Sequence, residues 1–104
     1  MNKIILKKLK IKSVKSLMDV IILSIVKDGS ITGYDAIGYI HEKYGVMMSA
    51  GTVYSHLYSL ERDGLIIGDV NEKSRIFAIT ENGKKILEIA KENAVEMLNT
   101  FSKS

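Results

Sequence analysis

The sequence predicts a mainly α-helical chain with one small β-hairpin, which belongs to the α+β class. Three patterns support this prediction. Apolar residues recur with helical spacing in three segments of the first two thirds of the chain, two short runs rich in β-branched residues follow, and a heptad pattern ends the sequence. With 104 residues, of which 26% are charged and 46% hydrophobic, the composition fits one soluble domain.

The first two helices are predicted from their apolar spacing and their ends. Over residues 14–28 apolar side chains follow helical spacing, and Ser13 is the candidate N-cap. The next helix is expected over residues 33–44, because Thr32 and Asp35 form a variant of the capping box and a glycine follows the last turn.

The third helix is expected over residues 49–63. Ser49 begins it, and Gly64 suits a left-handed stop that turns the chain into a strand. One apolar stripe runs along it, formed by Val53, Leu57 and Leu60.

A hairpin is predicted over residues 65–80. Residues 65–67 and 75–79 are too short for independent helices and are rich in β-branched or aromatic side chains. The polar residues between these two runs are typical of the turn that joins a pair of strands.

A final helix of about twenty residues is predicted after Thr80, its candidate N-cap. Its apolar residues form a heptad seam of Leu87, Ala90, Ala94, Met97 and Phe101. Such a seam either covers the core of its own chain or pairs two subunits. A homodimer is favoured, because the two alanines allow close helix approach.

The order helix, helix, helix, hairpin, helix is typical of a winged helix-turn-helix, whose third helix enters the DNA major groove. The predicted division is a basic N-terminal arm over residues 1–12, the winged helix-turn-helix over 13–80 and a C-terminal dimerisation helix over 81–104.

Four segments carry a family resemblance: residues 33–37 (Gly-Tyr-Asp-Ala-Ile), 49–57 (Ser-Ala-Gly-Thr-Val-Tyr-Ser-His-Leu), 60–66 (Leu-Glu-Arg-Asp-Gly-Leu-Ile) and 80–83 (Thr-Glu-Asn-Gly). In this order and spacing the chain resembles the PadR-like family of winged-helix transcriptional regulators. The resemblance implies a sequence-specific regulator that binds double-stranded DNA and pairs its subunits through the C-terminal region. Repression is the expectation for small dimeric regulators of this type.

The resemblance also implies a small aromatic effector, bound in a pocket at the dimer interface. This sequence has no tryptophan near such a pocket and only one short C-terminal helix, so the effector stays an open question.

The DNA-binding residues are expected on the outward face of the third helix and in the hairpin. With the apolar stripe set inward, this face is polar and nearly uncharged. Small hydroxyls can donate to phosphates or to several base edges, whereas strong sequence readout uses bidentate Arg, Asn or Gln, so modest base specificity is expected. The candidates are Ser49, Gly51, Thr52, Tyr54, Ser55, Tyr58, Ser59 and Arg62 in the helix, and Lys73 and Arg75 in the hairpin.

Packing is the alternative or the favoured role for four residues. Tyr54 matches a tyrosine at the DNA surface of the resembled family, and half-buried packing is its alternative role. Gly33 is expected to permit close helix contact, with Tyr34 half-buried beside it. His56 falls near the apolar side of the third helix and is expected to pack there.

Positive charge is concentrated at the N-terminus. Six lysines and no acid give the first fifteen residues +6, whereas the whole chain carries +3, so the remainder carries −3. Lys8, Lys10 and Lys12 are therefore candidates for contacts with DNA phosphates. The alternative is a solvated terminus that keeps the protein soluble.

Several classes of protein are excluded. The sequence has no cysteine and its two histidines are fifteen positions apart, so neither a metal nor a cofactor is predicted. It contains no phosphate-binding glycine loop, and Glu88, Glu92 and Glu96 have the spacing of a solvated helix face, so an enzyme is not expected. Its apolar runs are far shorter than the roughly 20 residues of a membrane span, which predicts a cytoplasmic protein without a membrane partner.

Two further functions remain open from the sequence. A winged helix can be a protein-interaction adaptor, although six N-terminal lysines favour DNA, because each phosphate contact releases a counterion. The hydroxyl-rich face of the third helix is also compatible with non-specific coating of DNA.

Overall fold

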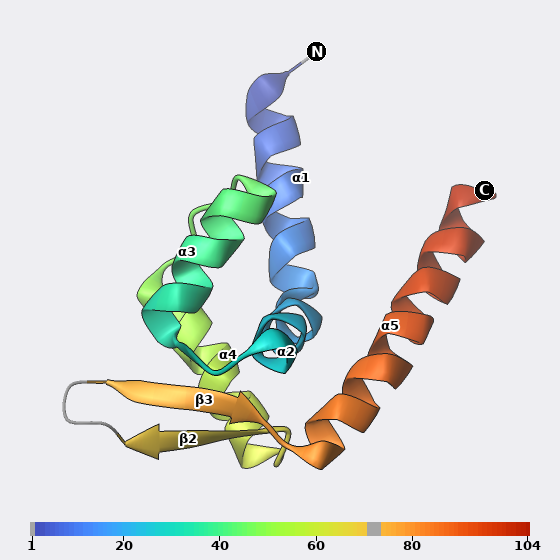
Figure 1. The fold of residues 1–104 in the computed structure, drawn as a ribbon. Coiled ribbons are helices and arrows are strands. Elements are labelled where there is room, and N and C mark those ends of the chain that lie inside the picture. Colours follow the sequence, from blue (N-terminus) through green and yellow to red (C-terminus); the bar gives the residue numbers. More distant parts are fainter. Residues whose placement is uncertain (1, 71–73) are drawn as a thin grey trace.

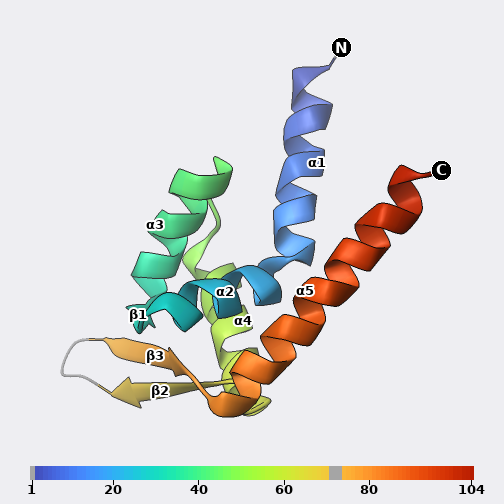
Figure 2. The same cartoon turned by 45° about the vertical axis from the view of Figure 1, so that its right-hand side comes forward.

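The computed structural model describes residues 2–70 and 74–104. In these described ranges, α2, α3, α4 and three short strands form a compact body from which two further helices, α1 and α5, extend (Figures 1 and 2). In chain order the elements are α1 (Lys3–Ser16), α2 (Met18–Asp28), β1 (Ile31–Thr32), α3 (Gly33–Tyr44), α4 (Ala50–Arg62), β2 (Ile66–Val70), β3 (Arg75–Ile79) and α5 (Glu81–Ser102). The predicted α+β class and winged helix-turn-helix order are confirmed.

The N-terminal region differs from the prediction, because the lysine-rich segment is itself the helix α1. Asn2 caps this helix, its side-chain oxygen accepting hydrogen bonds from the N–H groups of Ile4 and Ile5 at 2.9 and 3.3 Å. Lysine and leucine are strong helix formers, and Asn2 caps the N–H groups that have no partner within the first turn. The expected N-cap at Ser13 is wrong, and the predicted arm boundary after residue 12 falls inside α1.

The helix-turn-helix consists of α3 and α4, and both helices have the predicted caps. The Thr32 hydroxyl accepts from the Asp35 N–H at 3.1 Å, and the Asp35 carboxylate accepts from the Thr32 N–H at 2.9 Å. Gly45 ends α3 with φ +67°, and Gly64 follows α4 with φ +76°, both in the left-handed region that favours glycine.

The sheet is a three-stranded antiparallel ribbon with the order β1-β3-β2. The predicted hairpin is formed by β2 and β3, in which Gly68 pairs with Phe77. Strand β1 was not predicted; it consists of two residues beside β3, with Ile31 opposite Phe77. A strand of two residues has no periodic pattern in the sequence. It can be recognised as a strand only from its pairing with β3.

The core lies where α2, α3, α4 and the sheet meet. The predicted stripe of α4 is buried, with Val53 and Leu57 at 0% exposure. Phe77 from β3 and Met18 and Ile22 from α2 are also fully buried and pack in the same cluster. Full burial of each such side chain contributes roughly 1.5–3 kcal/mol, so this cluster fixes the position of α4 on the body.

Helix α5 begins at the predicted cap and leaves the body. The Thr80 hydroxyl accepts from the Gly83 N–H at 3.0 Å and donates to the Gly64 carbonyl at 2.7 Å. Leu87 packs in the core, but Met97 is 70% and Phe101 62% exposed. The seam of α5 therefore covers its own chain only at its beginning (Figures 1 and 2).

Candidate nucleic-acid interface

The predicted outward face of α4 is open to solvent. Gly51, Ser55, Tyr58 and Arg62 are exposed, whereas Thr52, Tyr54 and Ser59 are partly buried. Because α4 is the second helix of the helix-turn-helix, this face is the one that can enter a groove of a duplex. It offers hydroxyls, the phenols of Tyr54 and Tyr58, and the guanidinium of Arg62.

The N-terminus of α4 is capped by hydroxyl groups of the helix itself. The Ser49 hydroxyl accepts from the Thr52 N–H at 3.2 Å and donates to the Thr52 hydroxyl oxygen at 2.9 Å. This cap satisfies one of the free N–H groups at the helix N-terminus, which carries a partial positive charge. Ser49 and Thr52 thus shape a helix end that favours an anion such as a phosphate.

Tyr54 packs between the two helices of the helix-turn-helix. Its ring lies against Gly33, where an added Cβ would overlap it, so the predicted close contact at Gly33 is observed. Burial raises the pKa of the Tyr54 phenol, and the neighbouring Tyr34 and Tyr58 raise it further. The phenol therefore stays protonated and can donate a hydrogen bond at neutral pH.

Four aromatic rings form a row from α3 to the sheet. Tyr34 contacts Tyr54 edge-on with ring centroids 6.4 Å apart, Tyr58 follows at 5.9 Å, and Phe77 lies 6.4 Å beyond. Tyr34 is 71% exposed, so its expected half-burial is wrong. In α3, Gly33, Ala36 and Ile40 take the buried side, and that spacing turns Tyr34 outward. Tyr34 is therefore a surface residue beside α4 that was not predicted.

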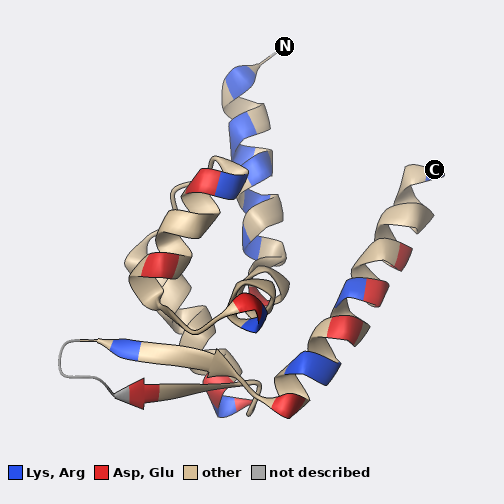
Figure 3. Ribbon diagram, viewed as in Figure 1, with Lys and Arg blue, Asp and Glu red and all other residues tan. Residues whose placement is uncertain are grey.

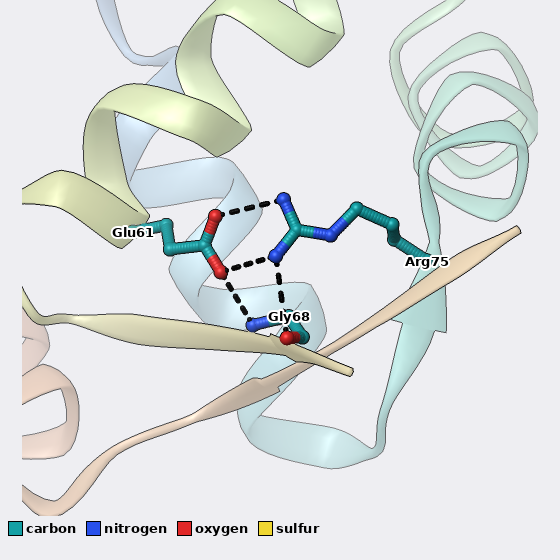
Figure 4. Close-up of polar contacts among 3 residues, drawn as sticks. All are labelled: Glu61, Gly68 and Arg75. Carbon is teal, nitrogen blue, oxygen red and sulfur yellow. Dashed lines mark hydrogen bonds and ion pairs between the residues drawn. The ribbon is translucent and has the colours of Figure 1, made fainter. Parts of the chain in front are cut away.

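Arg75 lies against α4 at the start of β3 (Figure 4). Its two terminal nitrogens donate to the two carboxylate oxygens of Glu61 at 2.9 and 2.6 Å. The hydrogen bond from Arg75, followed by that from the Gly68 N–H, lowers the pKa of the Glu61 carboxyl. The other predicted hairpin residue, Lys73, lies outside the described residues.

His56 packs on the other side of α4, as predicted. Its Nδ1 lies 2.7 Å from a carboxylate oxygen of Asp19 on α2. This contact joins α4 to α2 away from the outward face.

The α1 lysines are not brought to the face of α4. Lys8, Lys10 and Lys12 are carried on a helix that runs from the body toward the end opposite the hairpin (Figures 1 and 3). The ammonium of Lys10 lies near Gly45 at the C-terminus of α3, 3.2 Å from the position of an added Cβ. A cation stabilises the partial negative charge at such a helix end.

The described part of the chain has neither a cluster of metal ligands nor a membrane-spanning helix. Among residues 2–70 and 74–104, no group of three His, Asp or Glu side chains is placed to hold a metal ion. No helix in the described ranges is long and apolar enough to cross a membrane.

Comparison with known proteins places these features in a family. The transcriptional regulator PadR-like family matches residues 22–89. No curated protein matches the chain. A transcriptional regulator from Clostridium thermocellum is 25% identical with a TM-score of 0.82, over 88% of this chain and 96% of that one. A PadR family transcription regulator from Clostridium difficile is 26% identical with a TM-score of 0.70, over 82% and 97%. Bacillus subtilis PadR in complex with operator DNA is 24% identical with a TM-score of 0.62, over 69% and 44%.

Proposed function

The chain belongs to the PadR-like family of transcriptional regulators, and on that premise we propose that it is a repressor that binds specific double-stranded DNA as a homodimer. Family membership makes it a DNA-binding regulator and not an enzyme. The observation that carries the proposal is the exposed face of α4, set between the hairpin and the start of α3. A repressor of this kind acts in the cytoplasm, where it meets the DNA that it regulates.

The exposed side chains of α4 can make two kinds of contact with DNA, bidentate contacts from a guanidinium and single hydrogen bonds from hydroxyls. Arg62 can bind a guanine edge or a phosphate with two parallel hydrogen bonds, and Ser55 and Tyr58 can donate to phosphates or to several bases. Only one of these groups can discriminate strongly among bases. We therefore expect specificity that is real but modest, with much of the affinity provided by phosphates.

The homodimer is supported by apolar faces that the chain leaves uncovered. The distal part of α5 exposes Met97, Leu98 and Phe101, and Ala94 lies on the same side of the helix. Helix α1 also exposes apolar side chains, among them Ile5, Leu6 and Leu9. Pairing these faces in a second copy removes them from water and places two copies of α4 for two half-sites.

An aromatic effector stays a prediction for the interface between subunits. One depression on α5 is lined by Glu88, Lys91, Glu92, Val95 and Glu96, which is not the chemistry that a flat aromatic molecule prefers.

The test is a titration of the full chain with two duplexes across a range of salt. One duplex is enriched by the protein from a random-sequence pool, and the other is unselected. A repressor should bind the enriched duplex more tightly by about tenfold or more, with log affinity falling as log salt rises. Equal affinity for both would indicate DNA coating, and no binding to either would favour the adaptor.

A further inference from the structure

The end of α4 and the hairpin are tied together through one backbone position. Glu61, in the last turn of α4, accepts two hydrogen bonds from Arg75 and a third from the Gly68 N–H, at 2.8 Å. Arg75 also donates to the Gly68 carbonyl at 3.2 Å (Figure 4). The three residues belong to α4, β2 and β3, and we call them the hairpin anchor.

Close packing at Gly68 is part of this arrangement. A Cβ at position 68 would lie 2.8 Å from Cζ of Arg75 and 2.9 Å from Oε2 of Glu61. Those distances are shorter than ordinary contacts, so any larger residue would push the guanidinium or the carboxylate out of place. The absence of a side chain at Gly68 is therefore a condition for the bidentate pair.

The anchor also reaches the candidate interface. The guanidinium carbon of Arg75 lies 5.7 Å from the ring centroid of Tyr58 and 5.3 Å from that of Phe77. Tyr58 is one of the exposed residues of α4, whereas Phe77 is in the core. Arg75 thus contacts an exposed aromatic side chain of α4 while both of its terminal nitrogens are bonded to Glu61.

We propose that Glu61, Gly68 and Arg75 are positioning residues that fix the hairpin and Tyr58 relative to α4, and that Arg75 acts through Glu61 and not by contact with a phosphate. This inference rests on the proposed DNA-binding function. The terminal nitrogens of Arg75 already have carboxylate and carbonyl partners, so a phosphate would have to displace them. A surface held in its binding geometry loses less conformational entropy when it meets DNA.

The two roles of Arg75 predict opposite effects of Glu61→Gln. If Arg75 acts through Glu61, this variant should bind the enriched duplex about tenfold more weakly. If Arg75 is itself a phosphate contact, loss of the carboxylate should free the guanidinium and leave affinity unchanged or raise it. Asp63→Asn is the matched control, because it removes an exposed carboxylate next to α4 without touching Gly68 or Arg75.

Two more variants test the same proposal without relying on Glu61→Gln. Gly68→Ala changes no charge and should weaken binding in the same direction as Glu61→Gln. Arg75→Gln should leave the slope of log affinity against log salt unchanged, whereas loss of a phosphate contact would reduce it by about 0.9 per subunit. The double variant Glu61→Gln/Arg75→Gln should be no weaker than the weaker single variant.

All titrations are made well below the unfolding midpoint of each variant, which separates DNA affinity from simple loss of stability. Wild-type protein that binds neither duplex would refute the proposed function itself. Suppose instead that the wild type binds DNA. The positioning role of the hairpin anchor alone would then be refuted if Glu61→Gln and Gly68→Ala bind as tightly as the wild type, or if Arg75→Gln has a reduced salt slope.

Discussion

The ring of Tyr54 fills the space that a side chain on Gly33 would occupy. Gly33→Ala should therefore destabilise the protein by about 1–3 kcal/mol, since the Tyr54 ring, which is packed against the core, would have to shift to make room. Urea unfolding followed by circular dichroism measures this loss.

Gly38 provides the matched control on the same helix. A Cβ at Gly38 meets no atom within 4 Å, so Gly38→Ala should change stability by less than about 1 kcal/mol, in the stabilising direction. Equal gains at the two positions would show that helix propensity, and not the contact with Tyr54, determines the result.

The outward face of α4 is tested by adding charge to it. The double variant Ser55→Glu/Ser59→Glu should abolish DNA binding, because carboxylates would face phosphates, while circular dichroism and the thermal midpoint stay close to wild type. Ser55→Ala/Ser59→Ala removes the same hydroxyls without charge and should bind far better. Affinity of the Glu variant within about threefold of wild type would mean that this face does not meet DNA.

The α1 lysines are tested without disturbing the helix. We expect little change in the slope of log affinity against log salt when Lys8→Gln, Lys10→Gln and Lys12→Gln are combined. The change should be smaller than about 0.9 per subunit, the value for one direct phosphate contact. The reason is that α1 runs from the body toward the end opposite the hairpin (Figures 1 and 2). A loss of about three contacts per subunit would restore the role in DNA binding that the sequence suggested.

The dimer is tested in the seam of α5. Ala94→Asp/Met97→Asp would bury unpaired carboxylates between two helices, at several kcal/mol for each symmetric pair, so association should fail. Sedimentation at tens of micromolar reports the oligomeric state, and DNA affinity on the same samples should fall with it. Asn93→Asp/Asn99→Asp adds two charges outside the seam and should leave the dimer intact. A seam variant that stays dimeric would direct attention to α1.

The lowered pKa of Glu61 predicts how its contribution to stability depends on pH. A carboxyl with a lower pKa in the folded state stabilises the protein above its unfolded pKa, and that stability is lost as pH falls through the folded pKa. Wild type should therefore exceed Glu61→Gln in thermal midpoint by a constant amount at neutral pH, and the difference should shrink below about pH 4.3. If the difference in thermal midpoint between the wild type and Glu61→Gln did not depend on pH, the ionised carboxylate of Glu61 would not be the source of the stability.

Local signals predicted most of the fold. The caps at Thr32, Ser49 and Thr80 are short-range hydrogen bonds between residues three apart, so they can be recognised in the sequence. The buried stripe of α4 is a periodic pattern within one helix. Helix α1 was missed because its apolar residues do not gather on one face, and β1 because it exists only through β3.

The candidate site could be predicted only in part. The orientation of Ser55 and Arg62 follows from the stripe on their own helix. The partner of Arg75 does not, because Glu61 lies fourteen positions earlier and no local rule links a helix end to the start of a later strand. The exposure of Tyr34 was recoverable in principle, since Gly33, Ala36 and Ile40 mark the buried side of α3.

Strand β2 is at the edge of the sheet, and the backbone groups of Gly68 point away from β3. Exposed edge groups of this kind are a template on which a strand from another molecule can add. Glu61 and Arg75 occupy the N–H and the carbonyl of Gly68, so they block that addition at the middle of the edge. Their loss would open a route to intermolecular sheet growth, and the chain would then become prone to aggregate at concentrations where the wild type stays in solution.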